Sequence, residues 1–130
     1  MDVAIAHGID LVELGRIEEL IERHGERFLG RVFTAEERRY ADSNRARRVE
    51  KYAARFAAKE AVLKMIGTGW RGGVAWTDVE VVNDAAGKPV VSISGEVQRI
   101  AQEQGLGPIE ISITHAGGLA IASAVAVRKV

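Results

Sequence analysis

Apolar positions along the chain follow two kinds of pattern, one typical of strands and one typical of helices. Near-continuous runs of β-branched and aliphatic residues predict strands at 3–14, 78–82, 88–94, 109–115 and 119–127. Helices are predicted at 16–25, from Thr34 for a few turns, from about 45 to 66, and at 95–105. The predicted order is therefore strand, three helices, two strands, helix, two strands.

Local signals mark several ends of these elements. Gly15 is expected to break the first strand, and Gly25 to end the first helix. Thr34 and Glu37 have the spacing of a capping box, which predicts a helix start at Thr34. Gly67 is the expected stop of the long helix, and a glycine-rich loop follows at 67–73.

The two close strand pairs near the C-terminus predict an antiparallel sheet. Turn residues at 83–87 join one pair, and three small residues at 116–118 join the other. With the helices grouped on one side of the sheet, this order predicts the α+β class. At 130 residues, without an internal repeat or a linker, the chain is expected to form a single domain over 1–130.

Composition narrows the setting of the protein. The chain has no cysteine, which excludes disulfides and thiolate zinc sites. The N-terminus lacks the basic segment and the long apolar run that are typical of a signal peptide. No apolar run reaches the ~18 residues that a membrane span needs. We therefore expect a cytoplasmic protein that does not enter a membrane.

Arginine is concentrated in the first half of the chain. Residues 16–55 contain eleven of the eighteen Lys and Arg residues, together with eight acidic residues. Two interpretations stand: a solvated face of amphipathic helices, or a surface for an acidic partner. The interleaved acids and the sequence pI of about 6.8 disfavour nucleic acid as that partner.

Three ionisable residues occupy positions that the local period marks as inward. Glu60 continues an apolar helical stripe that resumes at Leu63 and begins with Val49, Tyr52, Ala53, Phe56 and Ala57. Asp10 is the one charge on its face of the first strand, and His115 ends a row of isoleucines in the fourth.

Each of these residues has an ordinary structural explanation. Asp10 could bond backbone at a bulge, Glu60 could pair with Lys64 one turn on, and His115 could be a satisfied residue at the rim of the core. Their combination instead favours a site. Two carboxylates without cysteine suit Mg²⁺ held by oxygen ligands.

The neighbours of Glu60 suit a polyphosphate. Lys64 projects to the same side of the helix, and Arg55 and Lys59 are expected to flank it, close to the glycine-rich loop. The sequence has no P-loop, HExxH, GxSxG or GxGxxG pattern, which excludes the corresponding nucleotide-binding, protease, hydrolase and Rossmann readings.

In these segments the chain resembles the holo-acyl-carrier-protein synthases, the small bacterial 4′-phosphopantetheinyl transferases. The segments that carry the resemblance occur in the family order along the whole chain: GIDLVELGRI (8–17), FTAEE (33–37), RFAAKEAVLKMIGTG (55–69), NDAAGKP (83–89) and ISITHAGGLAIASAVA (111–126). Met65, Ile66 and the WRGG stretch depart from the family pattern, but none of them falls on a metal or phosphate position.

The resemblance implies an activity and roles for the residues. Such enzymes move the phosphopantetheine arm of coenzyme A to a serine of apo acyl carrier protein and release adenosine 3′,5′-bisphosphate. Asp10 and Glu60 would bind magnesium, and Lys64 would offset charge on the leaving group. Glu60 would accept the serine proton, with Asp10 as the rival. Coenzyme A would contact Lys64, Gly67, Thr68, Gly69, Gly87, Lys88, Pro89 and His115.

The resemblance also implies partners. Acyl carrier proteins are acidic, so the arginines are expected to bind them, with Arg16 first and then Arg23, Arg27, Arg31 and Arg55. Short members of the family are homotrimers with the active site between subunits. Two rival readings of the chain stay open: a metal-dependent phosphohydrolase acting on a nucleotide, and a non-catalytic module that binds an acidic protein or RNA.

Overall fold

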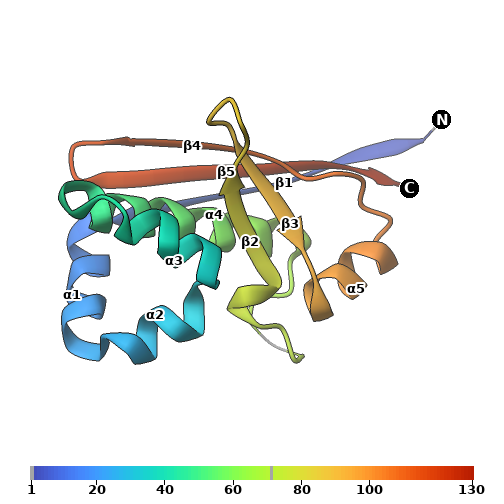
Figure 1. Cartoon of the computed structure of the whole chain (residues 1–130). Helices are drawn as coiled ribbons and strands as arrows, with labels where there is room; N and C mark the ends of the chain where they lie inside the picture. Colours follow the sequence, from blue (N-terminus) through green and yellow to red (C-terminus); the bar gives the residue numbers. More distant parts are fainter. Residues whose placement is uncertain (1, 71) are drawn as a thin grey trace.

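Helix α4 runs beneath a three-stranded antiparallel sheet and forms the centre of the fold (Figure 1). The computed structural model describes residues 2–70 and 72–130. The sheet has the order β1-β5-β4, and its strands are β1 (Val3–Glu13), β4 (Glu110–Ala116) and β5 (Leu119–Lys129). A separate antiparallel hairpin is made of β2 (Val79–Asn83) and β3 (Pro89–Ile93).

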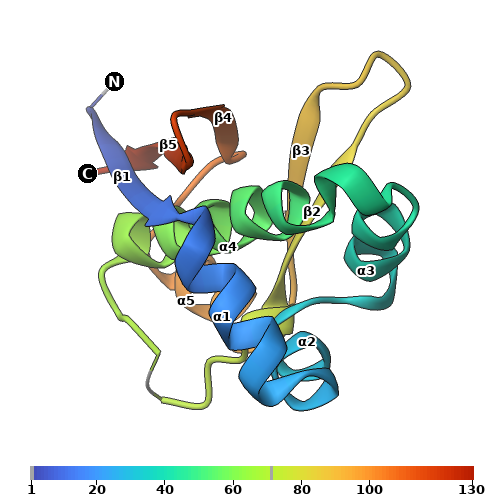
Figure 2. The same ribbon diagram turned by 90° about the vertical axis from the view of Figure 1, so that its left-hand side faces the viewer.

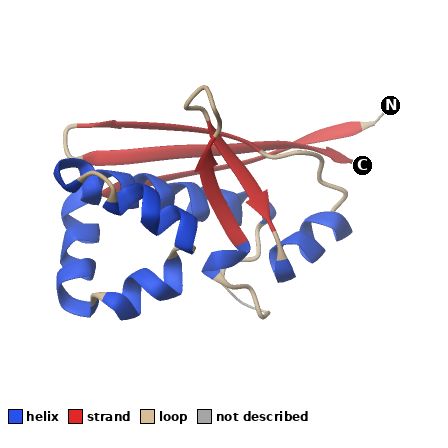
Figure 3. Ribbon diagram, in the orientation of Figure 1, coloured by secondary structure: helices blue, strands red, loops and turns tan. Residues whose placement is uncertain are grey.

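The helices gather on one face of the three-stranded sheet (Figure 3). They are α1 (Leu14–His24), α2 (Glu26–Val32), α3 (Ala35–Asp42), α4 (Arg48–Ile66) and α5 (Gly95–Glu103), with 3₁₀ turns η1 (Arg45–Arg47) and η2 (Trp76–Asp78). In the turned view the β2–β3 hairpin stands beside α4 (Figure 2). The predicted α+β class is confirmed, although the two predicted hairpins belong to two separate sheets.

Two details of the predicted element order are wrong. A helix that was not predicted, α2, lies between α1 and α3, because Phe28, Leu29 and Val32 turn toward the core over only seven residues. Such a short helix contains an interior glycine and shows too little periodicity to be read from the sequence. Gly15 does not separate β1 from α1. The helix begins at Leu14, whose N–H donates to the carbonyl of Gly118.

The helix ends predicted from local signals are confirmed. Thr34 caps α3: its hydroxyl accepts from Glu37 N–H, and the Glu37 carboxylate accepts from Thr34 N–H at 2.8 Å. Gly67 ends α4 with φ of 79°, a left-handed conformation that glycine adopts without steric cost.

The contact between α4 and the sheet is unusually close because small residues line it. Alternate positions of β5 are buried alanines, at 120, 122, 124 and 126. On β1, a Cβ atom at Gly8 would overlap the carbonyl of Ala61 and the backbone nitrogen of Met65. Gly8 therefore allows the β1 backbone to rest directly on α4.

The opposite face of the sheet carries exposed apolar side chains. Ile5, Ile9 and Leu11 on β1 are 53 to 65% exposed, and Val3 and Val127 extend the row. In Figure 1 no helix lies over this face. In the described part of the chain, no helix has both the length and the apolarity needed to cross a bilayer.

Candidate active site

Asp10 and Lys64 are brought together by the packing of β1 on α4. Asp10 lies on the inner face of β1, paired in register with Ala122 of β5. The register of β1 with β5 runs without interruption, so the alternative of a bulge at Asp10 is wrong. Lys64 Nζ lies 3.0 Å from Asp10 Oδ1 and donates to the carbonyl of Ile9 at 3.2 Å. Lys64 thus forms its ion pair with Asp10, fifty-four residues away, and reaches it from the last turn of α4.

Glu60 is half-buried one turn earlier on the same helix. Burial raises the pKa of its carboxyl group, and the nearby charge of Asp10 acts in the same direction. A hydrogen bond from Trp70 Nε1 to Glu60 Oε1, at 3.4 Å, opposes this increase in pKa, as do the charges of Lys64 and Arg16. Asp10 and Glu60 are therefore near enough for their charges to interact.

This pair of oxygen donors fits magnesium. Across residues 2–70 and 72–130, no cluster of three or more His, Cys, Asp or Glu side chains is arranged around one point. A site with two carboxylates leaves the other positions of an octahedral ion for waters and phosphate oxygens, which is how Mg²⁺ is commonly held in enzymes. Asp10 and Glu60 would hold such an ion, with Lys64 beside it.

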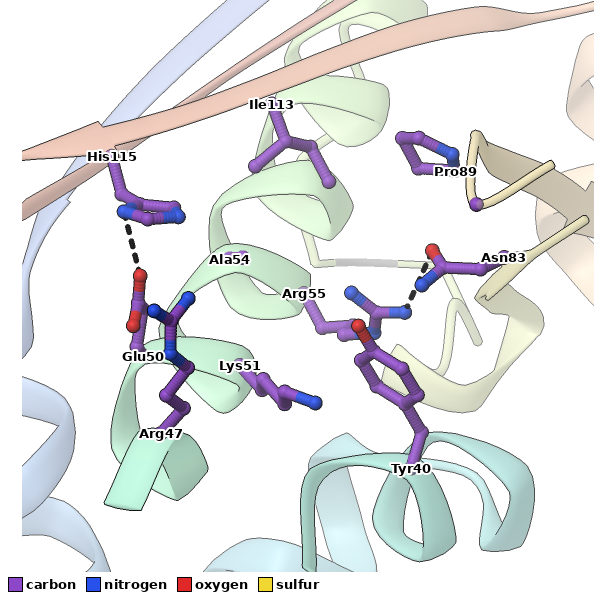
Figure 4. Close-up of a pocket in the computed structure, with 11 residues that line it drawn as sticks. Tyr40, Arg47, Glu50, Lys51, Ala54, Arg55, Asn83, Pro89, Ile113 and His115 are labelled. Atoms are coloured by element: carbon purple, nitrogen blue, oxygen red, sulfur yellow. Dashed lines mark hydrogen bonds and ion pairs between the residues drawn. The ribbon is translucent and has the colours of Figure 1, made fainter. Parts of the chain in front are cut away.

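A second group of predicted residues lines a separate cavity of about 250 Å³ (Figure 4). Its walls come from α3, η1, the first turns of α4, the β2–β3 hairpin and β4. Three cationic side chains, those of Arg47, Lys51 and Arg55, border it. The other lining residues are Tyr40, Glu50, Ala54, Asn83, Gly87, Pro89, Ile113 and His115. The excess of positive charge suits a phosphate-bearing ligand.

His115 lies at the mouth of this cavity. Its Nδ1 is 2.6 Å from Glu50 Oε1, and its side chain is 48% exposed. The prediction that His115 points inward is therefore only partly right. It continues the inner row of Ile111 and Ile113, but it sits where β4 passes the beginning of α4, so no core covers it.

Arg55 forms a nearly buried wall of the same cavity. Its Nη2 donates to Asn83 Oδ1 at 3.3 Å, and its guanidinium lies 4.2 Å from the centre of the Tyr40 ring. Burial lowers the pKa of Arg55. The buried Nε atom has no hydrogen-bond partner among the described residues, which leaves a donor for a ligand. Arg55 was predicted to bind the protein partner, but it lies in the cavity wall.

The two groups of residues are well separated within one chain. Asp10 on β1 and His115 on β4 lie at opposite edges of the sheet with β5 between them, about 10 Å apart across the strands. Along α4, Glu50 and Glu60 are ten residues apart, or about 15 Å. None of the residues lining the cavity is Asp10, Glu60 or Lys64.

The glycine-rich loop follows the carboxylate group rather than the cavity. Gly67 and Thr68 line a shallow surface hollow with Gly72, Glu96, Arg99 and Ile100. Within the predicted loop 67–73, Arg71 lies outside the described residues. Gly87 lies in the cavity wall, and Lys88 next to it forms an exposed ion pair with Glu110 at 3.1 Å.

Lys59 does not flank Glu60, which makes that prediction wrong. Its side chain is fully buried on another face of α4, where Nζ lies 2.8 Å from Glu37 Oε1. Burial lowers the pKa of Lys59, and Glu37 opposes this. The ammonium group also donates to the carbonyls of Trp76 and Val79, so the residue fixes the β2 segment to the helix.

Arg47 and Lys51 of the cavity were missed in the sequence. They lie four residues apart with Arg55, a spacing that places three cations on one side of the chain at α4 and could have revealed the cavity. Trp70 and Tyr40 gave no such signal, because their contacts depend on how a loop and α3 pack against α4.

Four arginines lie on α1 and α2, interleaved with four glutamates. Arg16 is exposed, and its guanidinium lies 5.9 Å from the centre of the Phe56 ring, close enough to Glu60 to affect its charge. Arg27 and Arg31 border a shallow hollow with His24 and Phe28. Arg23 forms an exposed ion pair with Glu19 at 2.9 Å.

A family model for the 4′-phosphopantetheinyl transferase superfamily matches residues 6–122. The chain belongs to this superfamily. It is 47% identical over 118 residues to a holo-[acyl-carrier-protein] synthase of Solibacter usitatus, and the match covers 91% of this chain and 94% of the relative.

Solved structures of the superfamily agree in fold. The crystal structure of holo-[acyl-carrier-protein] synthase from Neisseria meningitidis matches with a TM-score of 0.84 at 35% identity, covering 93% of this chain and 96% of the other. A holo-(acyl-carrier-protein) synthase from Bacillus anthracis, in complex with coenzyme A (3′,5′-ADP), matches with a TM-score of 0.78 at 35% identity, covering 98% and 100%.

Proposed function

We infer that the chain transfers the 4′-phosphopantetheine arm of coenzyme A to a serine hydroxyl of apo acyl carrier protein, with adenosine 3′,5′-bisphosphate as the second product. The observation that carries this inference is the presence, in a member of this superfamily, of a carboxylate pair with a lysine and of a separate cationic cavity. The first group suits the pyrophosphate of coenzyme A, and the second suits its 3′-phosphate and nucleoside.

The cationic cavity binds the nucleotide end of coenzyme A. Arg47, Lys51 and Arg55 supply positive charge, and His115 at the mouth contacts the 3′-phosphate side. Gly87, Lys88 and Pro89 of the hairpin turn lie against the nucleoside, and Gly67, Thr68 and Gly69 allow backbone to approach the phosphates. The unpaired Nε of Arg55 supports this assignment, since a buried guanidinium donor is stabilised by an anionic acceptor. We therefore assign Arg55 to coenzyme A rather than to the protein partner.

Asp10 and Glu60 would hold a magnesium ion, which would supply positive charge to the pyrophosphate oxygens. The serine oxygen attacks the β-phosphorus in line with the oxygen of the departing bisphosphate, whose bond to phosphorus breaks. Lys64, whose side chain is exposed beside Asp10, offsets the negative charge on the oxygen of the departing bisphosphate. Glu60 accepts the serine proton, since Asp10 is already paired with Lys64.

The arginines on α1 and α2 receive the acidic carrier protein. The charge of Arg16 is felt at Glu60, so a carrier bound to Arg16 would bring its serine toward the carboxylate pair. Arg23, Arg27 and Arg31 extend the surface away from the site. Exposed charges of this kind act mainly on the rate of association.

Two copies of the chain complete each active site, within a homotrimer. The separation of the two residue groups supports this, because a single ribose lies between the 3′-phosphate and the pyrophosphate of coenzyme A. The exposed apolar row of Val3, Ile5, Ile9, Leu11 and Val127 supplies a surface for the contact between copies. We place the reaction in the cytoplasm, as a step that prepares carriers for fatty acid biosynthesis.

The deciding experiment incubates the protein with coenzyme A, Mg²⁺ and an apo acyl carrier protein, and measures the intact mass of the carrier. The expected result is a mass gain equal to phosphopantetheine, lost when the acceptor serine is replaced by alanine. Hydrolysed coenzyme A beside an unmodified carrier would instead establish the phosphohydrolase. The molecular mass of the protein, measured by analytical ultracentrifugation, tests whether it forms the proposed trimer.

A further inference from the structure

The glycine-rich loop is attached to α4 by a stack of aromatic rings. Trp70 of the loop and Trp76 of η2 stack with ring centres 3.6 Å apart, at an interplanar angle of 28°. Trp76 in turn stacks on Phe56 of α4 at 5.0 Å, and Phe56 is buried in the core. Lys59 Nζ also holds the carbonyl of Trp76 at 3.2 Å. The Trp70 indole is thereby fixed relative to the helix that carries Glu60.

The polar edge of this fixed indole reaches the carboxylate group. Trp70 Nε1 donates to Glu60 Oε1 at 3.4 Å, long for such a bond, and catalytic contacts in ligand-free sites commonly shorten when the ligand binds. An indole has one donor and no acceptor, so it can orient a carboxylate without itself binding a cation. A carboxylate has two oxygens, and a donor on Oε1 leaves Oε2 for a metal ion.

We propose that Trp70 is a positioning residue that orients the Glu60 carboxylate for the divalent cation. This inference rests on the proposed function, because it needs Glu60 to be a metal ligand. Through Trp70, the loop that follows α4 then acts on the chemistry by a side chain. Trp70 contributes through its N–H, whereas its ring only anchors the loop.

Two substitutions separate these contributions. Trp70→Phe keeps an aromatic ring for the stack on Trp76 and removes the N–H. Trp76→Phe is the matched control, since it makes the same chemical change within the same stack but leaves the donor to Glu60. Binding of Mn²⁺ in the presence of coenzyme A is measured from the electron paramagnetic resonance signal of the free ion. Loss of the partner that orients a metal ligand typically weakens metal binding ~10- to 100-fold.

We expect the dissociation constant of Mn²⁺ to rise about 10-fold in Trp70→Phe, the lower end of that range, because the bond is long. Trp76→Phe should stay within about twofold of the parent protein. Equal affinity in Trp70→Phe and parent would overturn the proposal. So would an equal loss in both variants, which would assign the effect to the stack.

A fluorescence measurement tests the proposal in a chain that retains Trp70. The sequence contains two tryptophans, so Trp76→Phe leaves Trp70 as the one indole. Titration of this variant with Mg²⁺ and coenzyme A should change the Trp70 emission, and Glu60→Gln in the same background should abolish the change. Unchanged emission while Mn²⁺ binds would refute a contact with the metal ligand. If the parent protein modifies the carrier without any divalent cation, the metal assignment itself fails, and with it this proposal, while the transferase activity stands.

Discussion

Lys59 and Glu37 form a fully buried ion pair, with Nζ 2.8 Å from Oε1, that joins α4 to the cap of α3. The same carboxylate accepts from the N–H groups of Thr34 and Val81. One pair thus connects α3, α4 and β2, on a different face of α4 from the proposed metal ligand Glu60. Removing one partner of such a pair leaves a buried charge without compensation, which costs far more than the pair contributes.

Lys59→Met should therefore lower the free energy of unfolding by about 3–5 kcal/mol, measured by urea denaturation. The double variant Lys59→Met with Glu37→Gln removes the stranded charge and keeps an acceptor for the cap of α3. We expect the double variant to be more stable than Lys59→Met alone. If it is not, the loss comes from packing rather than from the unpaired carboxylate.

Glu60→Gln should reduce transfer at least ~100-fold with the fold intact, because the amide keeps the shape and loses the charge that holds the cation. Turnover is measured from the intact mass of the carrier, and the fold from circular dichroism. Glu36→Gln, an exposed change on α3 away from the proposed docking surface, is the control and should not affect turnover. A Glu60→Gln variant that keeps full activity would contradict the assignments of both metal ligand and base.

The raised pKa of Glu60 predicts a dependence of stability on pH in the absence of metal. The folded state holds the Glu60 proton to higher pH than the unfolded state, because burial disfavours the carboxylate. Stability therefore falls as pH rises from the unfolded pKa through the folded pKa, and the deficit persists above it. In EDTA, Glu60→Gln should be more stable than the parent at neutral pH, with the difference vanishing at acidic pH. The free energy of unfolding measured across pH checks this, and a gain from the variant that is the same at every pH would contradict it.

Arg16→Ala should raise the Michaelis constant for the carrier about 2- to 5-fold, the range expected for one exposed charge contact. The constant for coenzyme A should not change, since Arg16 does not line the cationic cavity. Arg39→Ala, which removes an exposed arginine of α3, is the matched control. The effect should shrink at high salt. An unchanged constant for the carrier would exclude Arg16 from docking.

The separation of Glu60 from His115 predicts complementation between inactive chains. Glu60→Gln lacks a carboxylate, and His115→Ala lacks the contact at the cavity, so each variant alone should have low transfer activity. In mixed trimers that contain both variants, with sites between copies, one site in three combines an intact Glu60 with an intact His115, and about a third of parent activity should return. The variants are co-expressed with different tags and purified on both. Activity no higher than that of the separate variants would place each site within one chain.

Much of the fold follows from local patterns in the sequence. The capping box at Thr34 and the glycine at 67 act within a few residues of themselves, so they could be read correctly. Gly15 was misread because a contact of Leu14 with Gly118, more than a hundred residues away, decides where α1 begins. α2 escaped notice because seven residues are too few for a period.

The site, like the fold, could be predicted only where its signals are local in the sequence. Asp10 and Glu60 could be proposed as site residues because a charge in an apolar row is visible in the sequence itself. Lys59 also lies on α4, but its partner Glu37 comes from another helix, so the sequence could not tell it from a site residue. The exposure of His115 depends on where β4 passes the beginning of α4, which no local pattern states.

Gly8 has a consequence for the proposed metal site. Because it lets β1 touch α4, it sets how far Asp10, two residues later, lies from Glu60 on the helix. Any side chain at position 8 would overlap the backbone of Ala61 and Met65 and push the strand away from the helix. We expect such a substitution to separate the two carboxylates and to weaken metal binding. The spacing of the two proposed ligands thus depends on a residue that has no side chain.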